Sequence, residues 1–215
     1  EDLSDLHNYV DKTRINKIRL SIFNKLNSDI EWEKQYFKLA ENAIKELLGP
    51  DLSIQIKLNF SIQLPGDETS ILMLHSDTLS GQSSYELVLW TALTNAFETN
   101  AMYMFDKAQS KKMYNLLPKY QYKGMEKLLN DKIDIANIMK VNSGDCILFS
   151  STLFHGNRLN ETNKTRISLN CRFKSLFSPE YSKTPHERVT GTFYKPFTFS
   201  PVTELGLNYN DEIDF

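Results

Sequence analysis

The amino-acid sequence predicts a mainly β fold with flanking helices, and three stretches support this. Residues 54–64 alternate between apolar and polar side chains, as a long half-buried strand does. Residues 166–173 alternate in the same way, which predicts a second strand with one polar face. Residues 1–50 instead repeat apolar side chains at three- and four-residue spacing, which is typical of amphipathic helices. We expect these helices to cover the outside of a sheet, because a sheet must bury its apolar face.

The N-terminal helices have recognisable limits. A second helix is expected to begin near Asp29, and Gly49-Pro50 ends it. Shorter strands follow the long one. They are expected at residues 70–75, 86–92, 101–105, 133–141 and 145–149.

Residues 107–132 are polar and lysine-rich, and they read as a loosely helical insertion interrupted at Pro118 and Gly124. Such an insertion either lies over a pocket mouth or is a solvated surface excursion. Residues 178–215 are expected to wrap the core with little regular structure. The predicted organisation is therefore one domain over 1–215, with bracing helices at 1–50 and a β core at 52–177.

Composition excludes several function classes. The 215 residues suffice for one domain with a sizeable core, and a net charge of −2 gives no basic footprint for nucleic acid. No apolar run is long enough to predict a transmembrane helix, so no membrane partner is expected. The start of the chain lacks the basic and apolar segments of a signal peptide, so we expect a cytoplasmic protein. Cys146 and Cys171 are expected to be free thiols in apolar strands.

Two histidines and one aspartate form a candidate metal site. His75 and Asp77 are two residues apart, so on an extended strand their side chains point to the same side. His155 would complete the two-histidine, one-carboxylate set that holds non-haem Fe(II) and leaves open positions for O2 and an organic cosubstrate. The simpler alternative is a hydrogen-bonded core pair, His75 with Asp77, and a turn histidine at 155.

The strand after His155 has an unusual polar face. Arg166, Ser168, Asn170 and Arg172 all point to one side of it. Two arginines on an inward face are unfavourable unless they meet anions. A guanidinium can bind a carboxylate through two hydrogen bonds, and a hydroxyl two residues along can add another. The alternative for Arg166 is an ordinary surface salt bridge.

Together these residues resemble the 2-oxoglutarate/Fe(II)-dependent dioxygenases, in particular the phytanoyl-CoA hydroxylase branch. Arg166 follows His155 by eleven residues, as in that branch. The local sequence is also similar to oxygenases of carbohydrate-biosynthesis gene clusters, over roughly residues 55–175. The similar segments are His75-Ser-Asp-Thr-Leu-Ser-Gly-Gln82, Glu86-Leu-Val-Leu-Trp90, Phe154-His-Gly-Asn157 and Arg166-Ile-Ser-Leu-Asn170.

The resemblance implies a double-stranded β-helix, which is a jelly-roll, cupin-like barrel. It implies that the catalytic residues His75, Asp77 and His155 bind Fe(II), and that Arg166 and Ser168 hold the far carboxylate of the cosubstrate 2-oxoglutarate. Reaction with O2 would then hydroxylate or otherwise oxidise a small-molecule substrate, such as a sugar, a sugar nucleotide or a glycan precursor. Gln63 and Trp90 are further candidates for the wall of the cosubstrate pocket. Gln82, Asn157 and Arg172 are candidates for contact with the substrate.

Two other functions stay open at this point. A cupin-type metalloenzyme could use the same barrel without 2-oxoglutarate, although it would leave Arg166 and Ser168 unexplained. A non-catalytic jelly-roll module that binds carbohydrate could keep the barrel, although it would need no complete ligand set.

Overall fold

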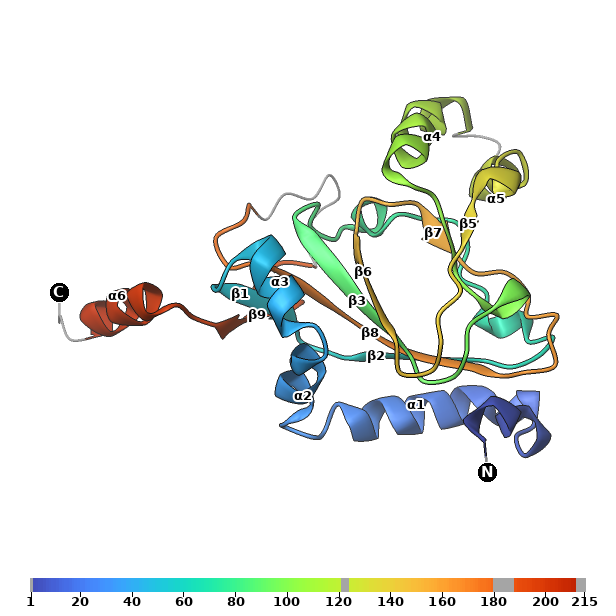
Figure 1. Ribbon diagram of the computed structural model, residues 1–215, viewed down its shortest axis with the longest axis horizontal. Coiled ribbons are helices and arrows are strands. Elements are labelled where there is room, and N and C mark those ends of the chain that lie inside the picture. Colours follow the sequence, from blue (N-terminus) through green and yellow to red (C-terminus); the bar gives the residue numbers. More distant parts are fainter. Residues whose placement is uncertain (1, 121–123, 180–187, 212–215) are drawn as a thin grey trace.

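The computed structural model describes residues 2–120, 124–179 and 188–211, and it shows two antiparallel sheets with helices on the outside (Figure 1). The larger sheet has the strand order β6-β3-β8-β1-β9, and β2 also pairs with β8. The smaller sheet has the order β5-β4-β7. This is the predicted mainly β fold with flanking helices.

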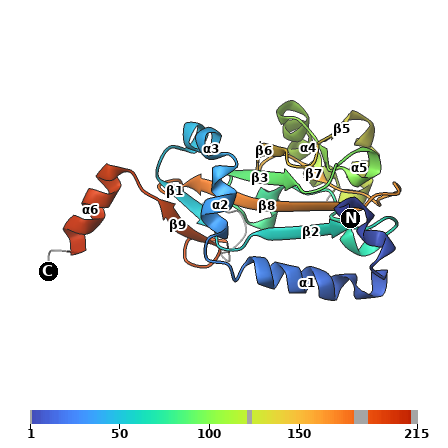
Figure 2. The same cartoon turned by 60° about the horizontal axis from the view of Figure 1, so that its bottom comes forward.

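Strand β8 is the centre of the larger sheet, because it pairs with β1, β2 and β3. The strands of this sheet are β1 (Leu52–Gln55), β2 (Asn59–Gln63), β3 (Glu86–Ala92), β6 (Cys146–Ser150), β8 (Arg166–Ser175) and β9 (Tyr194–Thr198). The smaller sheet consists of β4 (Tyr103–Met104), β5 (Asn137–Ile138) and β7 (His155–Gly156). Both ribbon views place the smaller sheet on the side of β8 that faces away from helix α1 (Figure 2).

The N-terminal helices cover the outer face of the larger sheet, as predicted. They are α1 (Ile15–Leu26), α2 (Trp32–Lys38) and α3 (Glu41–Leu48). Where the sequence predicts one second helix, the structure has two, α2 and α3, which are separated at Leu39-Ala40. Trp32 and Phe37 pack with Phe173 of β8, and Ile15 packs with Ile167 of the same strand. Burying each large apolar side chain contributes about 1.5–3 kcal/mol, so these contacts hold the helices on the sheet.

The long strand expected over residues 54–64 is interrupted, and β1 and β2 pair with β8 separately. Asn27, just after α1, explains the break. Its side-chain carbonyl accepts from the Leu58 N–H at 2.8 Å, and its amide donates to the Leu58 carbonyl at 3.0 Å. A continuous strand pairing would need these backbone groups, and the helix end occupies them instead.

Other predicted strands are shorter than expected or absent. Only two of the residues 101–105 form a strand, β4, and only two of the residues 133–141 form a strand, β5. Residues 70–75 form no strand. By contrast, the strand expected over 86–92 is β3 with the same limits, and Cys146 and Cys171 are free thiols, as expected.

The insertion at 107–132 is helical, with α4 (Lys107–Tyr120) and α5 (Gly124–Asn130) in its described part. Pro118 lies inside α4 and does not interrupt it. Met113 and Leu128 pack in a buried cluster with Leu74 and Phe154. Because Leu74 and Phe154 directly precede the two candidate ligand histidines, the insertion braces the segments that carry them.

The C-terminal segment has more regular structure than expected. Strand β9 joins the edge of the larger sheet beside β1, and α6 (Pro201–Asp211) projects away from the body of the molecule (Figure 1). The prediction of an irregular tail over 178–215 was therefore wrong for these two elements. Its parts at 180–187 and 212–215 lie outside the described residues. In the described part of the chain, no helix is long and apolar enough to cross a membrane.

Candidate metal centre and cosubstrate pocket

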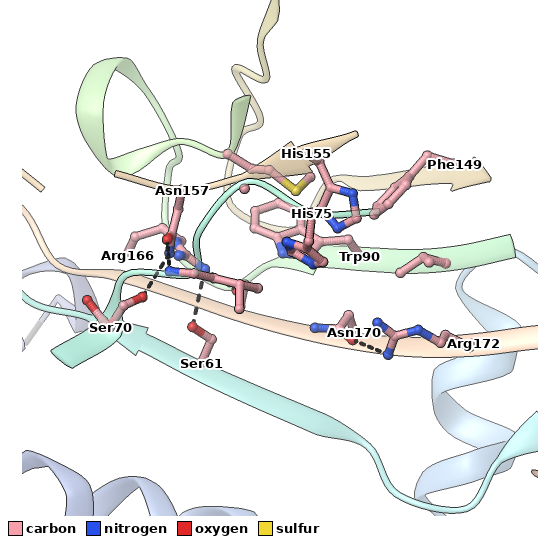
Figure 3. Close-up of a pocket in the computed structure, with 15 residues that line it drawn as sticks. Ser61, Ser70, His75, Trp90, Phe149, His155, Asn157, Arg166, Asn170 and Arg172 are labelled. Atoms are coloured by element: carbon pink, nitrogen blue, oxygen red, sulfur yellow. Dashed lines mark hydrogen bonds between the residues drawn. The ribbon is translucent and has the colours of Figure 1, made fainter. Parts of the chain in front are cut away.

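His75, Asp77 and His155 meet at one point, as the sequence predicts. One ligand atom from each lies within 4.8 Å of the other two. The His75 Nε2 is 3.6 Å from the Asp77 Oδ1, and the two imidazole ring centroids are 4.3 Å apart. Figure 3 shows both rings beside the same cavity. Such a set of two imidazoles and one carboxylate suits a first-row divalent metal.

The backbone brings the two histidines together. The His75 N–H donates to the His155 carbonyl at 3.0 Å, and the His155 N–H donates to the His75 carbonyl at 2.8 Å. This is an isolated bridge and not a regular strand for His75. Asp77 begins a 3-10 turn, Asp77–Ser80, so the two ligands do not share a strand face. The three side chains come together as expected, but the extended geometry expected for His75 and Asp77 was wrong.

Hydrogen bonds orient both imidazoles for metal binding. The Nδ1 of His75 lies 2.7 Å from the Met73 carbonyl, and the Nδ1 of His155 lies 2.9 Å from the Leu153 carbonyl. A carbonyl only accepts, so each Nδ1 carries the proton and each Nε2 is left as a ligand atom. Burial lowers the pKa of His155 to about 4, which keeps this ring neutral at neutral pH. The donor set therefore fits a bound Fe(II).

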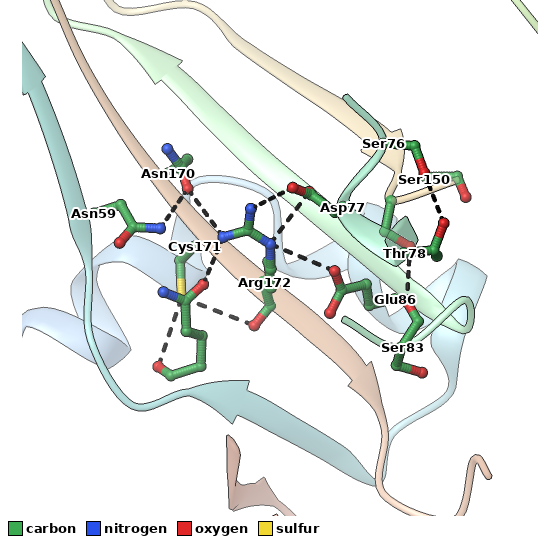
Figure 4. Close-up of polar contacts among 12 residues, drawn as sticks. Asn59, Ser76, Asp77, Thr78, Ser83, Glu86, Ser150, Asn170, Cys171 and Arg172 are labelled. Atoms are coloured by element: carbon green, nitrogen blue, oxygen red, sulfur yellow. Dashed lines mark hydrogen bonds and ion pairs between the residues drawn. The ribbon is translucent and has the colours of Figure 1, made fainter. Parts of the chain in front are cut away.

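Arg172 holds the carboxylate of Asp77. Its Nη2 donates to Asp77 Oδ1 at 2.9 Å, and its Nε donates to Oδ2 at 3.3 Å (Figure 4). Although burial acts to raise the pKa of Asp77, His75 and Arg172 together hold it well below its usual range. Asp77 is thus ionised, as a metal ligand must be.

Glu86 completes this buried charge network. Its Oε1 lies 3.4 Å from the Arg172 Nε, and its Oε2 accepts a short hydrogen bond from the Tyr194 hydroxyl. Burial raises the pKa of Glu86 to about 8. Sequence reasoning missed Glu86 and Tyr194, because Glu86 reads as an ordinary strand end and Tyr194 lies more than a hundred residues away.

Arg166 lies in a buried polar cage in the same sheet. Its Nη2 donates to Gln63 Oε1 at 3.0 Å and its Nη1 to Ser168 Oγ at 2.6 Å, while its Nε donates to the Asn100 carbonyl at 3.2 Å. Its Nη1 also lies 3.4 Å from Ser61 Oγ. The side chain is only 4% exposed, and no carboxylate in the described part of the chain pairs with it. Burial lowers its pKa to about 10, so at neutral pH it is a buried cation with no counter-ion among the described residues.

A cavity of about 130 Å³ connects Arg166 with the two histidines. Trp90 forms part of its wall, with the Arg166 guanidinium carbon 6.0 Å from the centre of its ring. The ring of Phe149 packs against His155 at a centroid distance of 5.1 Å. The pocket thus has a cationic end, apolar walls and a metal-binding end, a shape that suits a short dicarboxylate.

A sequence model of the phytanoyl-CoA dioxygenase family matches residues 5–168, which is most of the chain. The chain belongs to this family. The match confirms the resemblance at the level of the non-haem oxygenase superfamily and, with the two antiparallel sheets, the predicted jelly-roll fold. No curated protein matches the sequence.

Solved structures of non-haem oxygenases are similar in fold. HygX from Streptomyces hygroscopicus with iron bound is 16% identical, with a TM-score of 0.56 over 83% of this chain and 84% of HygX. HygX with nickel, 2-oxoglutarate and hygromycin B bound is 15% identical, with a TM-score of 0.52 over 78% of this chain and 70% of HygX. The non-haem monooxygenase ThoJ, in its nickel complex, is 20% identical with a TM-score of 0.46 over 78% of this chain. The chain spans 64% of the length of ThoJ and 52% of the epimerase SnoN.

In this member of the phytanoyl-CoA dioxygenase family, the predicted cosubstrate and substrate residues make contacts with other parts of the protein. Gln63 anchors Arg166 through its side-chain carbonyl, and its amide donates to the Arg158 carbonyl at 2.6 Å. Asn157 lines the cavity of about 130 Å³, and its side chain forms hydrogen bonds with the backbone of Leu72 and Ser70. A role for Asn157 or Arg172 in binding the substrate stays a prediction.

The sequence predicted part of the polar face that strand β2 contributes beside β8. The alternation at 54–64 predicts Asn59, Ser61 and Gln63 on one face of a strand. In the structure these three residues pair in register with Asn170, Ser168 and Arg166 of β8. Ser61 was missed as a pocket residue, although its place on the face of Gln63 was the signal that could have found it.

Proposed function

We propose that this protein is an oxygenase that uses Fe(II), 2-oxoglutarate and O2 to hydroxylate or otherwise oxidise a small polar molecule. One observation carries this proposal. Arg166 is a buried guanidinium with no counter-ion among the described residues, and it faces a cavity whose other end is lined by His75 and His155, two members of the His75–Asp77–His155 set. A dicarboxylate whose other end binds a metal supplies the missing negative charge.

The residues have separate roles in this proposal. His75, Asp77 and His155 hold the iron, which when bound supplies oxidising chemistry with O2 as 2-oxoglutarate is converted to succinate and CO2. Arg166 binds the far carboxylate, and the hydroxyl of Ser168 can donate to the same group while it accepts from Arg166. Trp90 and Phe149 line the cavity with apolar rings.

Two observations bear on the substrate class. The net charge of −2 disfavours nucleic acid. HygX has been solved with hygromycin B bound beside 2-oxoglutarate, and it shares the fold. We propose a sugar, a sugar nucleotide or a glycan precursor as the substrate, in keeping with the local similarity to oxygenases of carbohydrate-biosynthesis gene clusters.

Succinate release tests the proposed function. The protein is incubated with Fe(II), 2-oxoglutarate and O2, and succinate is measured with and without a panel of sugars. Wild type should release succinate, and Asp77→Ala should not, because it lacks the carboxylate ligand. Asp134→Ala, on an exposed 3-10 turn, is the matched control and should behave as wild type.

The alternatives give other results. A cupin-type enzyme without 2-oxoglutarate would bind iron at the same residues and release no succinate. A carbohydrate-binding module would bind its ligand equally well in wild type and in Asp77→Ala.

A further inference from the structure

A second cavity, of about 270 Å³, adjoins the candidate metal centre. Leu72, His75 and Arg172 line both this cavity and the one that reaches Arg166, so the two cavities meet beside the candidate ligand His75. Asp77 lines the second cavity and not the first. The first cavity ends at a buried cation and suits the cosubstrate, so the second is left for the molecule that is oxidised.

Gln82 is an unsatisfied polar group in the wall of this second cavity. Gly81 adopts a left-handed conformation at φ 94°, and the Gln82 N–H then donates to the Asp77 carbonyl at 3.2 Å. This turn places Gln82 directly beside the metal ligand. Its side chain is 4% exposed, yet its Oε1 has no hydrogen-bond partner among the described residues. Buried acceptors nearly always have a donor, so a ligand hydroxyl or amine is the natural partner here.

The cavity wall also carries an excess of positive charge. Its charged groups in the described part of the chain are Asp77, Arg172 and Arg188. Asp77 and Arg172 form an ion pair with each other at 2.9 Å. Arg188 is the remaining cation, and its guanidinium carbon lies 5.4 Å from the centre of the Phe193 ring, which also lines the cavity. A bound divalent metal would add to this positive charge, so an anionic ligand is favoured.

Neutral polar groups complete the wall. Asn59 lies on β2, and its amide donates to Asn170 Oδ1 at 2.9 Å, which leaves its side-chain carbonyl as a further acceptor. Two amide acceptors beside one guanidinium match a molecule with hydroxyl groups and one acidic group.

We propose that this second cavity binds the substrate to be oxidised, and that the substrate is a hydroxylated molecule with a carboxylate or phosphate group. Gln82 accepts a hydrogen bond from a substrate hydroxyl, and Arg188 binds the acidic group. The inference rests on the proposed function, because it takes the other cavity as the cosubstrate site. It narrows the substrate from polar molecules in general to acidic ones.

Calorimetric titration of the protein loaded with nickel(II) and 2-oxoglutarate tests this, because the nickel form binds without turnover. The probes are glucose, glucuronate and glucose 1-phosphate, which share a ring and differ in charge. At least one charged probe should bind about tenfold or more tightly than glucose, a difference of ~1.4 kcal/mol. The comparison between the two charged probes tells a carboxylate from a phosphate.

Substitutions test which residues cause the preference for a charged probe. Arg188→Met should abolish the preference for the charged probe. Arg14→Met, which removes the same charge from an exposed site in the N-terminal segment, should keep it. Gln82→Leu should weaken the binding of all probes that bind, about tenfold, while the preference for charge survives.

Three outcomes would overturn the inference: equal affinity for all three probes, binding of none of them, or a preference that survives Arg188→Met. The affinity for 2-oxoglutarate is measured in the same wild-type sample before each titration. If 2-oxoglutarate itself does not bind, the proposed function has failed. If it binds normally and no charge preference follows, this inference alone has failed.

Discussion

Arg172 and Asp77 form a two-point ion pair, with the Nη2–Oδ1 distance at 2.9 Å and the Nε–Oδ2 distance at 3.3 Å. The arginine comes from the central strand β8, whereas the carboxylate begins a 3-10 turn. A turn alone would leave the carboxylate free to rotate. The rigid sheet therefore fixes the direction of a metal ligand that lies outside it.

Replacing Arg172 should weaken metal binding. Arg172→Lys keeps a positive charge but loses the planar fork, so Asp77 is held less firmly. We expect a loss of affinity for Fe(II) or Ni(II) of about 10- to 100-fold, as is usual when a group that orients a metal ligand is removed. Titration with nickel under anaerobic conditions measures this. Unchanged affinity would mean that the turn alone positions Asp77.

Replacing Arg166 should weaken cosubstrate binding and spare the metal. Arg166→Lys should lower the affinity for 2-oxoglutarate by about tenfold or more, because a charged hydrogen bond is worth about 1.5–3 kcal/mol. Arg166→Ala should lose more. The measurement is an anaerobic titration of the Fe(II) protein, followed by the absorbance of the bound 2-oxo acid. Normal affinity in both variants would move the cosubstrate site elsewhere.

The stability of the metal-free protein should depend on pH through His155. Its pKa is about 4 when folded and 6.5 ordinarily. Between these values the unfolded chain binds more protons than the folded one, so this contribution to stability is lost as the pH falls. The loss from about pH 7 to about pH 5 should be roughly 2 kcal/mol, on 1.36 kcal/mol per unit of pKa.

Glu86 acts in the opposite sense, so the test compares variants. Its pKa is raised from 4.5 to about 8, so the folded protein binds the extra proton in that range and stability falls as the pH rises. Urea unfolding of wild type and of His155→Gln at both pH values separates the two effects. Wild type should lose roughly 2 kcal/mol more than the variant on acidification, on the same constant. If wild type and His155→Gln lost the same unfolding free energy on acidification, His155 would not be the cause of the pH dependence.

Gly156, next to the ligand His155, has no room for a side chain. A Cβ at this position would clash with the Tyr103 hydroxyl and lie 2.8 Å from the Leu72 carbonyl. Gly156→Ala should lower the free energy of unfolding by about 1–3 kcal/mol, as overpacking usually does. Gly206→Ala is the matched control, since nothing lies within 4 Å of a Cβ there. Urea titration of both variants measures the difference.

Two features of the sequence predicted which candidate site residues come together. The alternation of residues 166–173 placed Arg166 and Arg172 on one face, and the structure has β8 there. His75 and His155 stood out because the chain has only four histidines. The local conformation at Asp77 was missed, although the Asp, Ser and Gly residues of 76–81 are typical of a turn.

Contacts between distant segments could not be read from the pattern. The break between β1 and β2 depends on Asn27, which is 31 residues from Leu58. The ion pairs of Arg172 with Asp77 and Glu86, 95 and 86 residues earlier in the chain, were not predicted, and its expected contact with the substrate stays a prediction. Periodicity reports which face a side chain occupies, whereas the partner it meets on that face depends on the tertiary fold.

Strand β8 fixes the spacing between Arg166 and Arg172. Arg166 and Arg172 lie six residues apart on it, and its pairing with β3 continues from Ser168 to Lys174 without a bulge. At about 3.3 Å per residue, the strand separates the two arginine positions by roughly 20 Å and keeps them on one face. Inserting one residue between them would turn one arginine to the opposite face. Deleting two residues would keep the face and shorten the spacing by about 7 Å, so the number of residues in one strand fixes the distance between the polar cage of Arg166 and the ion pair of Arg172 with Asp77.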